Sequence, residues 1–305
     1  MGTGRERLQE SRWIAEKAQG TGEGGSVKRQ EMRNTERQER MEALLNDIFD
    51  THAHYDDEAF DGDREELLSQ LPRQGIGRVV NVGASLASCK KSMDLAEKYE
   101  YIYAAIGVHP SETAELNEEN FAELKKMCMH PKCVAVGEIG LDYYWPEPDA
   151  GLQKEWFVRQ LELARELEKP VVIHSRDACQ DTLDVMKAEK CGEIGGVIHC
   201  YAYTKETARE YLDMGFFFGI GGVLTFKNAR KLREAVEYIP LDNLVIETDC
   251  PYLAPEPHRG KRNSSLNLPY VVAQLAAIKG LSEEEIRKAT WRNACRLYRM
   301  ERDTF

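Results

Sequence analysis

Residues 169–201, KPVVIHSRDACQDTLDVMKAEKCGEIGGVIHCY, contain the pattern that decides the fold. Two short apolar runs rich in β-branched residues, 170–176 and 196–201, flank an amphipathic stretch of helical length, 178–190. A strand, a helix and a second strand in this order predict a βαβ unit, in which the two strands run parallel. Both apolar runs are interrupted near their carboxyl ends by a histidine, His174 and His199.

The same alternation continues on both sides of this unit. Further strand-like runs occur at 48–54, 78–83, 102–109, 133–140, 216–222 and 244–249. Amphipathic stretches of helical length lie between them, at 64–74, 87–98, 118–129, 153–167, 205–214 and 229–236, and two more follow the last strand, near 268–279 and 282–299. Ser282 and Glu285 have the spacing of a capping box at a helix start.

Strands that alternate with helices in this number predict an α/β protein built as a single (β/α)8 TIM barrel, which typically needs about 250 residues. The alternative is an open doubly wound sheet, which usually carries a glycine-rich turn after its first strand. The segment at that position, DTHAH (50–54), has no glycine. The sequence therefore favours the barrel.

The amino-terminal 46 residues differ in composition from the rest of the chain. They contain a Gly/Ser-rich break at 20–26 and no convincing apolar face. We expect residues 1–46 to form a disordered or loosely helical extension, and residues 47–305 to form the barrel. No apolar run is long enough for a membrane span and the first 30 residues lack a signal-peptide pattern, so we expect a cytoplasmic protein without a membrane partner.

Charge and cysteine usage narrow the function further. The formal net charge of −11 disfavours non-specific binding to polyanions, so a nucleic acid would have to be bound by a local basic patch. The eight cysteines include no C-x-x-C pair, and we expect them to be reduced thiols. We see no sign of an obligate protein partner.

Metal-ligating residue types gather where the predicted strands end. In a barrel the carboxyl ends of all strands meet at one face, where catalytic residues collect. Imidazoles and carboxylates are suitable ligands for divalent cations, and the candidates are His52, His54, Glu138, His174, His199 and Asp249. These are too many for one ion that keeps an open position, and they predict two divalent cations, with Mg, Mn and Zn all compatible.

We expect Glu138 to bridge the two ions, since its strand lies between those of the other candidate ligands. His52, His54 and Asp249 would then hold one ion, and His174 and His199 the other. Two cations in such a centre clamp the attacking and leaving oxygens of an in-line displacement, which predicts hydrolysis. Asp249 could also accept the proton of the attacking water, with Glu247 as a supporting carboxylate.

Several residues are candidates for the substrate side of the site. His109 ends the third strand, and Arg176 could stabilise developing phosphoryl charge or form a salt bridge to Asp177 or Glu138. The loop HRGKRN (258–263) follows the eighth strand, where barrels commonly bind phosphate, and its cations are Arg259, Lys261 and Arg262. The aromatic residues of nearby loops, Tyr201 among them, could stack on bases or simply pack the loops together.

The motifs along the chain resemble those of the TatD family of metal-dependent deoxyribonucleases. The resemblance rests on FDTHAH (49–54), GVHP (107–110), GEIGLDYY (137–144), PVVIHSRDA (170–178), VIHCY (197–201), GIGGVLTFKNA (219–229), IETDCPYLAP (246–255) and HRGKRN (258–263). It implies a TIM barrel with divalent metals that hydrolyses phosphodiester bonds in DNA, often from a 3′ end. The family's ligand pattern matches all six candidates named above, and we identify Glu138, Asp249 and Arg176 as the candidate catalytic residues.

Two positions depart from the family pattern: Tyr55 stands where Leu is common, and Ser265 where Pro often follows the RGKRN segment. Two other functions stay open at this point. One is hydrolysis of an ester or amide, such as deacylation of mischarged aminoacyl-tRNA, because related barrels use the same metal centre for such bonds. The other is a non-catalytic binding platform, against which the intact ligand set speaks.

Overall fold

A computed structural model describes residues 47–300 of the chain. Its centre is one sheet of eight parallel strands in the order β1 to β8, so that each strand pairs with the next one in sequence. The strands are β1 (Ile48–Ala53), β2 (Ile76–Val82), β3 (Ile102–Ile106), β4 (Cys133–Asp142), β5 (Val171–Arg176), β6 (Gly196–Ile198), β7 (Phe217–Ile220) and β8 (Leu244–Ile246).

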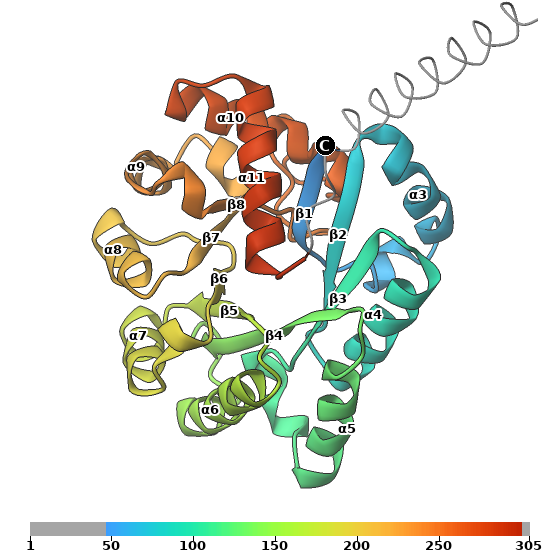
Figure 1. Ribbon diagram of the computed structural model, residues 1–305, viewed down its shortest axis with the longest axis vertical. Helices are drawn as coiled ribbons and strands as arrows, with labels where there is room; N and C mark the ends of the chain where they lie inside the picture. The colour runs from blue at the N-terminus through green and yellow to red at the C-terminus, as the bar shows by residue number, and fades with distance from the viewer. Residues whose placement is uncertain (1–46, 301–305) are drawn as a thin grey trace, which may run out of the picture. The chain divides into compact units, whose positions relative to one another are not determined.

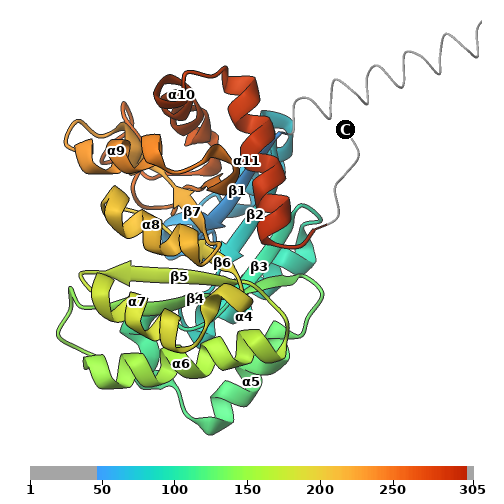
Figure 2. The same cartoon turned by 60° about the vertical axis from the view of Figure 1, so that its left-hand side comes forward.

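Helices surround the sheet, as Figures 1 and 2 show. They are α3 (Arg64–Gln70), α4 (Leu86–Lys98), α5 (Glu118–Cys128), α6 (Ala150–Glu166), α7 (Cys179–Ala188), α8 (Lys205–Asp213), α9 (Arg230–Tyr238), α10 (Leu268–Lys279) and α11 (Glu283–Leu297). This is the (β/α)8 TIM barrel that the alternating pattern predicts. The expected extension over 1–46 lies outside the described residues.

The barrel closes between the carboxyl end of β1 and the segment that follows β8. The amide of Asp249 donates to the carbonyl of His52 at 2.9 Å, and Ala53 forms a parallel bridge with Cys250. Closure places the residues that follow the first and the last strand side by side.

A buried polar network supports this closure. The carboxylate of Asp50 accepts hydrogen bonds from the hydroxyls of Thr248 at 2.7 Å and Ser265 at 2.6 Å. Because the Ser265 hydroxyl donates to Asp50, the Tyr55 hydroxyl, 2.8 Å away, donates to Ser265. The two positions that depart from the family pattern are therefore direct partners, and they join β1 to the turn before α10.

Four strands end two or three residues earlier than the sequence pattern suggests, among them β3 at Ile106 instead of 109 and β7 at Ile220 instead of 222. The apolar runs predict strands to residue 201 and to residue 249, whereas β6 ends at Ile198 and β8 at Ile246. Cys200 and Asp249 have φ angles of 45° and 55°, a left-handed conformation that cannot continue a strand. The chain therefore turns at these points and leaves His199 and Asp249 on the rim of the barrel.

The opposite end of the barrel is filled by apolar side chains. Phe49 of β1 packs there with Trp291 and Tyr298 at ring-centroid distances of 5.6 and 5.9 Å. The larger part of the core lies between the strands and the surrounding helices. The capping box of Ser282 and Glu285 is present at the start of α11, as predicted.

The structure also bears on the expectations about membrane spans and cysteines. Within residues 47–300 no helix combines the length and the apolar character that a bilayer crossing requires. All eight cysteines lie in this range and all are free thiols.

Candidate metal centre

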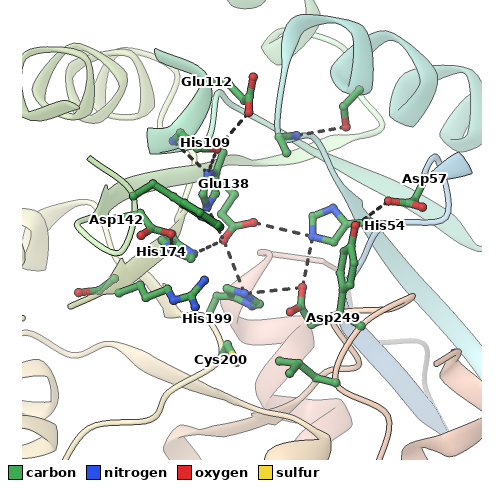
Figure 3. Close-up of a pocket in the computed structure, with 18 of the residues that line it drawn as sticks. His54, Asp57, His109, Glu112, Glu138, Asp142, His174, His199, Cys200 and Asp249 are labelled. Carbon is green, nitrogen blue, oxygen red and sulfur yellow. Dashed lines mark hydrogen bonds and ion pairs between the residues drawn. The ribbon is translucent and has the colours of Figure 1, made fainter. Parts of the chain in front are cut away.

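Six side chains from five strands or their carboxyl ends come together at the rim of the barrel, with Glu138 at the centre. Figure 3 labels all of them except His52. β1 supplies His52 and, one residue past its end, His54; β4 supplies Glu138 and β5 supplies His174. His199 and Asp249 follow β6 and β8. These are the six residues that the sequence singles out as metal ligands.

One carboxylate oxygen of Glu138 faces the histidines of β1. The Nε2 atoms of His52 and His54 lie 3.0 Å apart and 3.3 and 3.8 Å from Glu138 Oε2. Asp249 Oδ1 is 3.8 and 3.3 Å from the same two nitrogens. Ligands at about 2.1 Å from a tetrahedral ion are about 3.4 Å from one another, so His52, His54 and Glu138 fit one divalent cation, with Asp249 close to both histidines.

The other oxygen of Glu138 faces the histidines of β5 and β6. Glu138 Oε1 lies 2.7 Å from His174 Nδ1 and 3.6 Å from His199 Nε2. The His199 Nε2 atom is also 3.9 Å from Asp249 Oδ1. The two oxygens of Glu138 thus face two different pairs of histidines, and His199 also lies close to Asp249 of the first set. A carboxylate in this position could bridge two cations.

Atoms behind the ligands hold the imidazoles in place. The Nδ1 atom of His54 lies 2.8 Å from the carbonyl oxygen of Val82, so its Nε2 faces the site. The Nδ1 atom of His199 lies 3.0 Å from Glu247 Oε1, which also accepts a hydrogen bond of 2.6 Å from the amide of Cys200. Contacts of this kind fix the tautomer of metal-binding histidines.

The electrostatics of the cluster favour bound cations. Burial alone would raise the pKa of Glu138, but His199, His52 and the contact with His174 hold it well below its usual range. Burial would lower the pKa of His54, yet Asp249 and Glu138 raise it to about 9. The carboxylates are therefore ionised and keep protons on neighbouring imidazoles, and a divalent cation that binds would displace such protons.

The cluster forms the floor of an open cavity of about 910 Å³. His109 and Arg176 line its wall together with Trp145, Tyr252 and Leu253. The guanidinium of Arg176 lies 3.8 Å from the ring centroid of Tyr144, a cation–π contact rather than the salt bridge to Asp177 or Glu138 that the sequence left as the alternative. A cavity of this size and lining can admit a nucleotide-sized ligand.

The other predicted substrate residues do not line this cavity. Tyr201 is 2% exposed, its ring packs on Phe218 and its hydroxyl donates to the carbonyl of Thr204, so it is part of the core. Arg262 forms two hydrogen bonds to the carboxylate of Asp63, at 2.7 and 2.5 Å. Arg259 and Lys261 are exposed and lie outside the cavity lining. None of these four residues is among those that line the metal cavity.

Some cavity residues escape sequence reasoning. Asp142 Oδ2 lies 3.1 Å from His174 Nε2 and orients that imidazole. It is four residues after Glu138 on the same strand, and the period-two alternation of side chains places both on one face, a signal that could have identified it. Asp56 also lines the cavity, where it accepts hydrogen bonds from Asn81 and Ser88, and nothing in the local sequence indicates this.

The barrel and its cluster of ligands define a metal-dependent hydrolase, and comparisons with known proteins name the family. A sequence model described as TatD related DNase matches residues 49–299. The chain belongs to the TatD family. It is 44% identical over 253 residues to metal-dependent hydrolase YabD of Bacillus subtilis, a match that covers 83% of this chain and 99% of YabD.

Two further similarities extend this result. The chain is 33% identical over 257 residues to a protein named 3′-5′ ssDNA/RNA exonuclease TatD from Cronobacter sakazakii, covering 82% of this chain and 97% of that protein. Among solved structures, YjjV of Escherichia coli, a TatD homologue, superimposes with a TM-score of 0.78 at 28% identity, covering 84% of this chain and all of YjjV.

Proposed function

We propose that this metal-dependent hydrolase is a deoxyribonuclease that hydrolyses phosphodiester bonds of DNA from 3′ ends. The observation that carries the proposal is the position of Glu138 between two sets of donors, on the floor of a cavity with a guanidinium in its wall. The name of the relative from Cronobacter sakazakii supports the substrate class and the 3′ polarity.

The donor sets fit two divalent cations, Mg, Mn or Zn. His52, His54, Asp249 and Glu138 would hold one, and His174, His199 and Glu138 the other. Cations bound there would lower the pKa of a bound water and neutralise phosphate charge. The donor atoms within each of the groups His52/His54/Glu138, His52/His199/Asp249 and Glu138/His174/His199 are already within 4.8 Å of one another, so little reorganisation would be needed for binding.

Three side chains would act on the substrate and the attacking water. Asp249 is ionised, and its side chain is 19% exposed in the cavity, so its carboxylate can accept the proton of the water. Arg176 would pair with the scissile phosphate. His109 Nδ1 accepts a hydrogen bond from the amide of Ser111 at 3.1 Å, which leaves Nε2–H as a donor toward the cavity.

The test uses the purified full chain with 5′-labelled single-stranded DNA and each divalent cation in turn. We expect a ladder of products shortened from the 3′ end, lost on chelation and absent with the His174→Ala variant as the blank. Aminoacyl-tRNA is run in parallel. Release of the amino acid without any cleavage of DNA would overturn the proposal in favour of a deacylase.

A further inference from the structure

A second hollow lies beside the metal cavity. It has a volume of about 380 Å³ and lies between the loop after β7 and the start of α9, with Phe226, Arg230 and Lys231 among its lining residues. Ala202, in the loop after β6, is exposed and lines both this hollow and the metal cavity. The two spaces are therefore neighbours on the same face of the barrel.

The rim of the hollow is basic. Arg230 and Lys231 line it and are exposed, and Lys227, which follows the lining residue Phe226 in the chain, is exposed as well. The guanidinium of Arg259 lies 4.4 Å from the ring centroid of Phe226, so a cation of the loop after β8 belongs to this rim as well. One carboxylate, Glu234, lies 3.7 Å from Arg230. Four cations in or next to one hollow contrast with the net charge of −11 of the whole chain.

Hydrogen bonds build this rim independently of any ligand. Arg233 donates to the carbonyl oxygens of Phe226 at 2.7 Å and Lys227 at 3.0 Å. The Thr225 hydroxyl accepts a hydrogen bond of 2.8 Å from the amide of Glu256, which ties the rim to the loop that carries Arg259. A preformed site of this kind loses little conformational entropy when a ligand binds.

The metal cavity itself offers few cations for the phosphates of a long strand. Within residues 47–300, Arg176 is the one Lys or Arg among its lining residues, which otherwise include several carboxylates. A single guanidinium there can pair with the phosphate that reacts. The following phosphates of a longer strand need cations elsewhere, because phosphate contacts dominate the affinity of proteins for nucleic acids.

We propose that the basic hollow, defined by Phe226, Lys227, Arg230, Lys231 and Arg259, binds the backbone phosphates of the single strand that continues from the nucleotide in the metal cavity. The inference rests on the proposed nuclease function. The occupant is a single-stranded polynucleotide, since its charge complements the rim and Ala202 connects the two spaces. The hollow would thus determine how strongly long strands are preferred over short ones.

The experiment compares a 12-nucleotide single strand with a dinucleotide as substrates of the full chain loaded with metal. The variant carries Arg230→Ala and Lys231→Ala together. We expect the ratio of KM for the long strand to KM for the dinucleotide to rise roughly tenfold at low salt. The slope of log KM for the long strand against log salt should fall by about 1.4, since each cation contributes roughly 0.7 with single strands.

The matched control carries Lys90→Ala and Lys91→Ala on α4. These are two adjacent exposed cations, and Lys90 lies 3.5 Å from Glu123, much as Arg230 lies near Glu234. The control should leave the KM ratio and the salt slope unchanged. Equal melting temperatures show that both variants are folded.

The outcomes separate the two proposals. If the wild-type chain cleaves neither substrate, the proposed function is wrong. If it cleaves both and the Arg230/Lys231 variant keeps the wild-type KM ratio and salt slope, the proposed function stands and the role of the hollow is refuted. A change of equal size in the control variant would also refute it, because the effect would then be one of net charge.

Discussion

Replacing Glu247 with Gln should weaken metal binding about 10- to 100-fold, the usual effect of removing a group that orients a metal-binding histidine. Glu247 is 1% exposed and does not face the cavity. Its Oε1 atom lies 3.0 Å from His199 Nδ1 and accepts the Cys200 amide at 2.6 Å. Gln has nearly the same shape and can keep these contacts, but it removes the negative charge that makes the imidazole of His199 a stronger donor.

The expected loss corresponds to about 1.4 to 2.8 kcal/mol of binding free energy, at 1.4 kcal/mol per factor of ten. We would measure it by titrating Zn²⁺ or Mn²⁺ into the chelator-stripped protein in a calorimeter, with a competing chelator if binding is tight. Glu284→Gln on α11, an exposed position that does not line the metal cavity, is the matched control and should leave the dissociation constant unchanged.

A second variant perturbs the same carboxylate by a different route. A Cβ atom added at Gly219 would lie 2.0 Å from Glu247 Oε2, so Gly219→Ala must displace that side chain. We expect it to weaken metal binding in the same direction. If both variants fold and bind metal as tightly as the wild type, Glu247 does not orient His199 and the reasoning is refuted.

Three further predictions test the closure network, the role of the cations and the basic loop. Tyr55→Phe and Ser265→Ala should each lower the free energy of unfolding, measured by urea denaturation, by about 1–3 kcal/mol. A double-mutant cycle of the two should give a coupling energy of about 0.5–3 kcal/mol. Additive effects of the two substitutions would contradict the shared network. Chelation should abolish hydrolysis and lower the melting temperature, and adding the cation back should restore both the activity and the melting temperature. An unchanged melting temperature would argue against a site that binds metal in the folded state. Arg262→Ala should change KM for a long DNA strand less than twofold, because Asp63 already pairs with its guanidinium; a larger increase would return this residue to the binding surface.

The sequence predicts the fold, and it singles out six candidate ligands that the structure brings together, because both depend on local patterns. Alternating apolar runs specify strands, and polar residues at their ends stand out against the apolar background, as His174 and His199 do. The basic loop is harder to interpret. Arg262 donates hydrogen bonds to Asp63, 199 positions away in the chain. No local sequence pattern predicts such a distant partner.

The two departures from the family pattern likewise involve partners that are distant in the sequence. Tyr55 and Ser265 look like two unrelated changes in the sequence, 210 positions apart. In the fold their hydroxyls are partners in one buried network, so each explains the other. Strand ends were also missed, since Cys200 and Asp249 adopt left-handed conformations that side-chain periodicity does not reveal.

The contact between the beginning and the end of the barrel has a consequence for synthesis on the ribosome. Asp249 comes into place only when the segment after β8 meets β1, a contact illustrated by Asp50 and Thr248, 198 positions apart. A growing or prematurely terminated chain can carry the histidines of β1 and β5 and still lack the last carboxylate. The complete donor set therefore first exists once Asp249 has been added, and products that end before it would not be able to assemble the full metal centre.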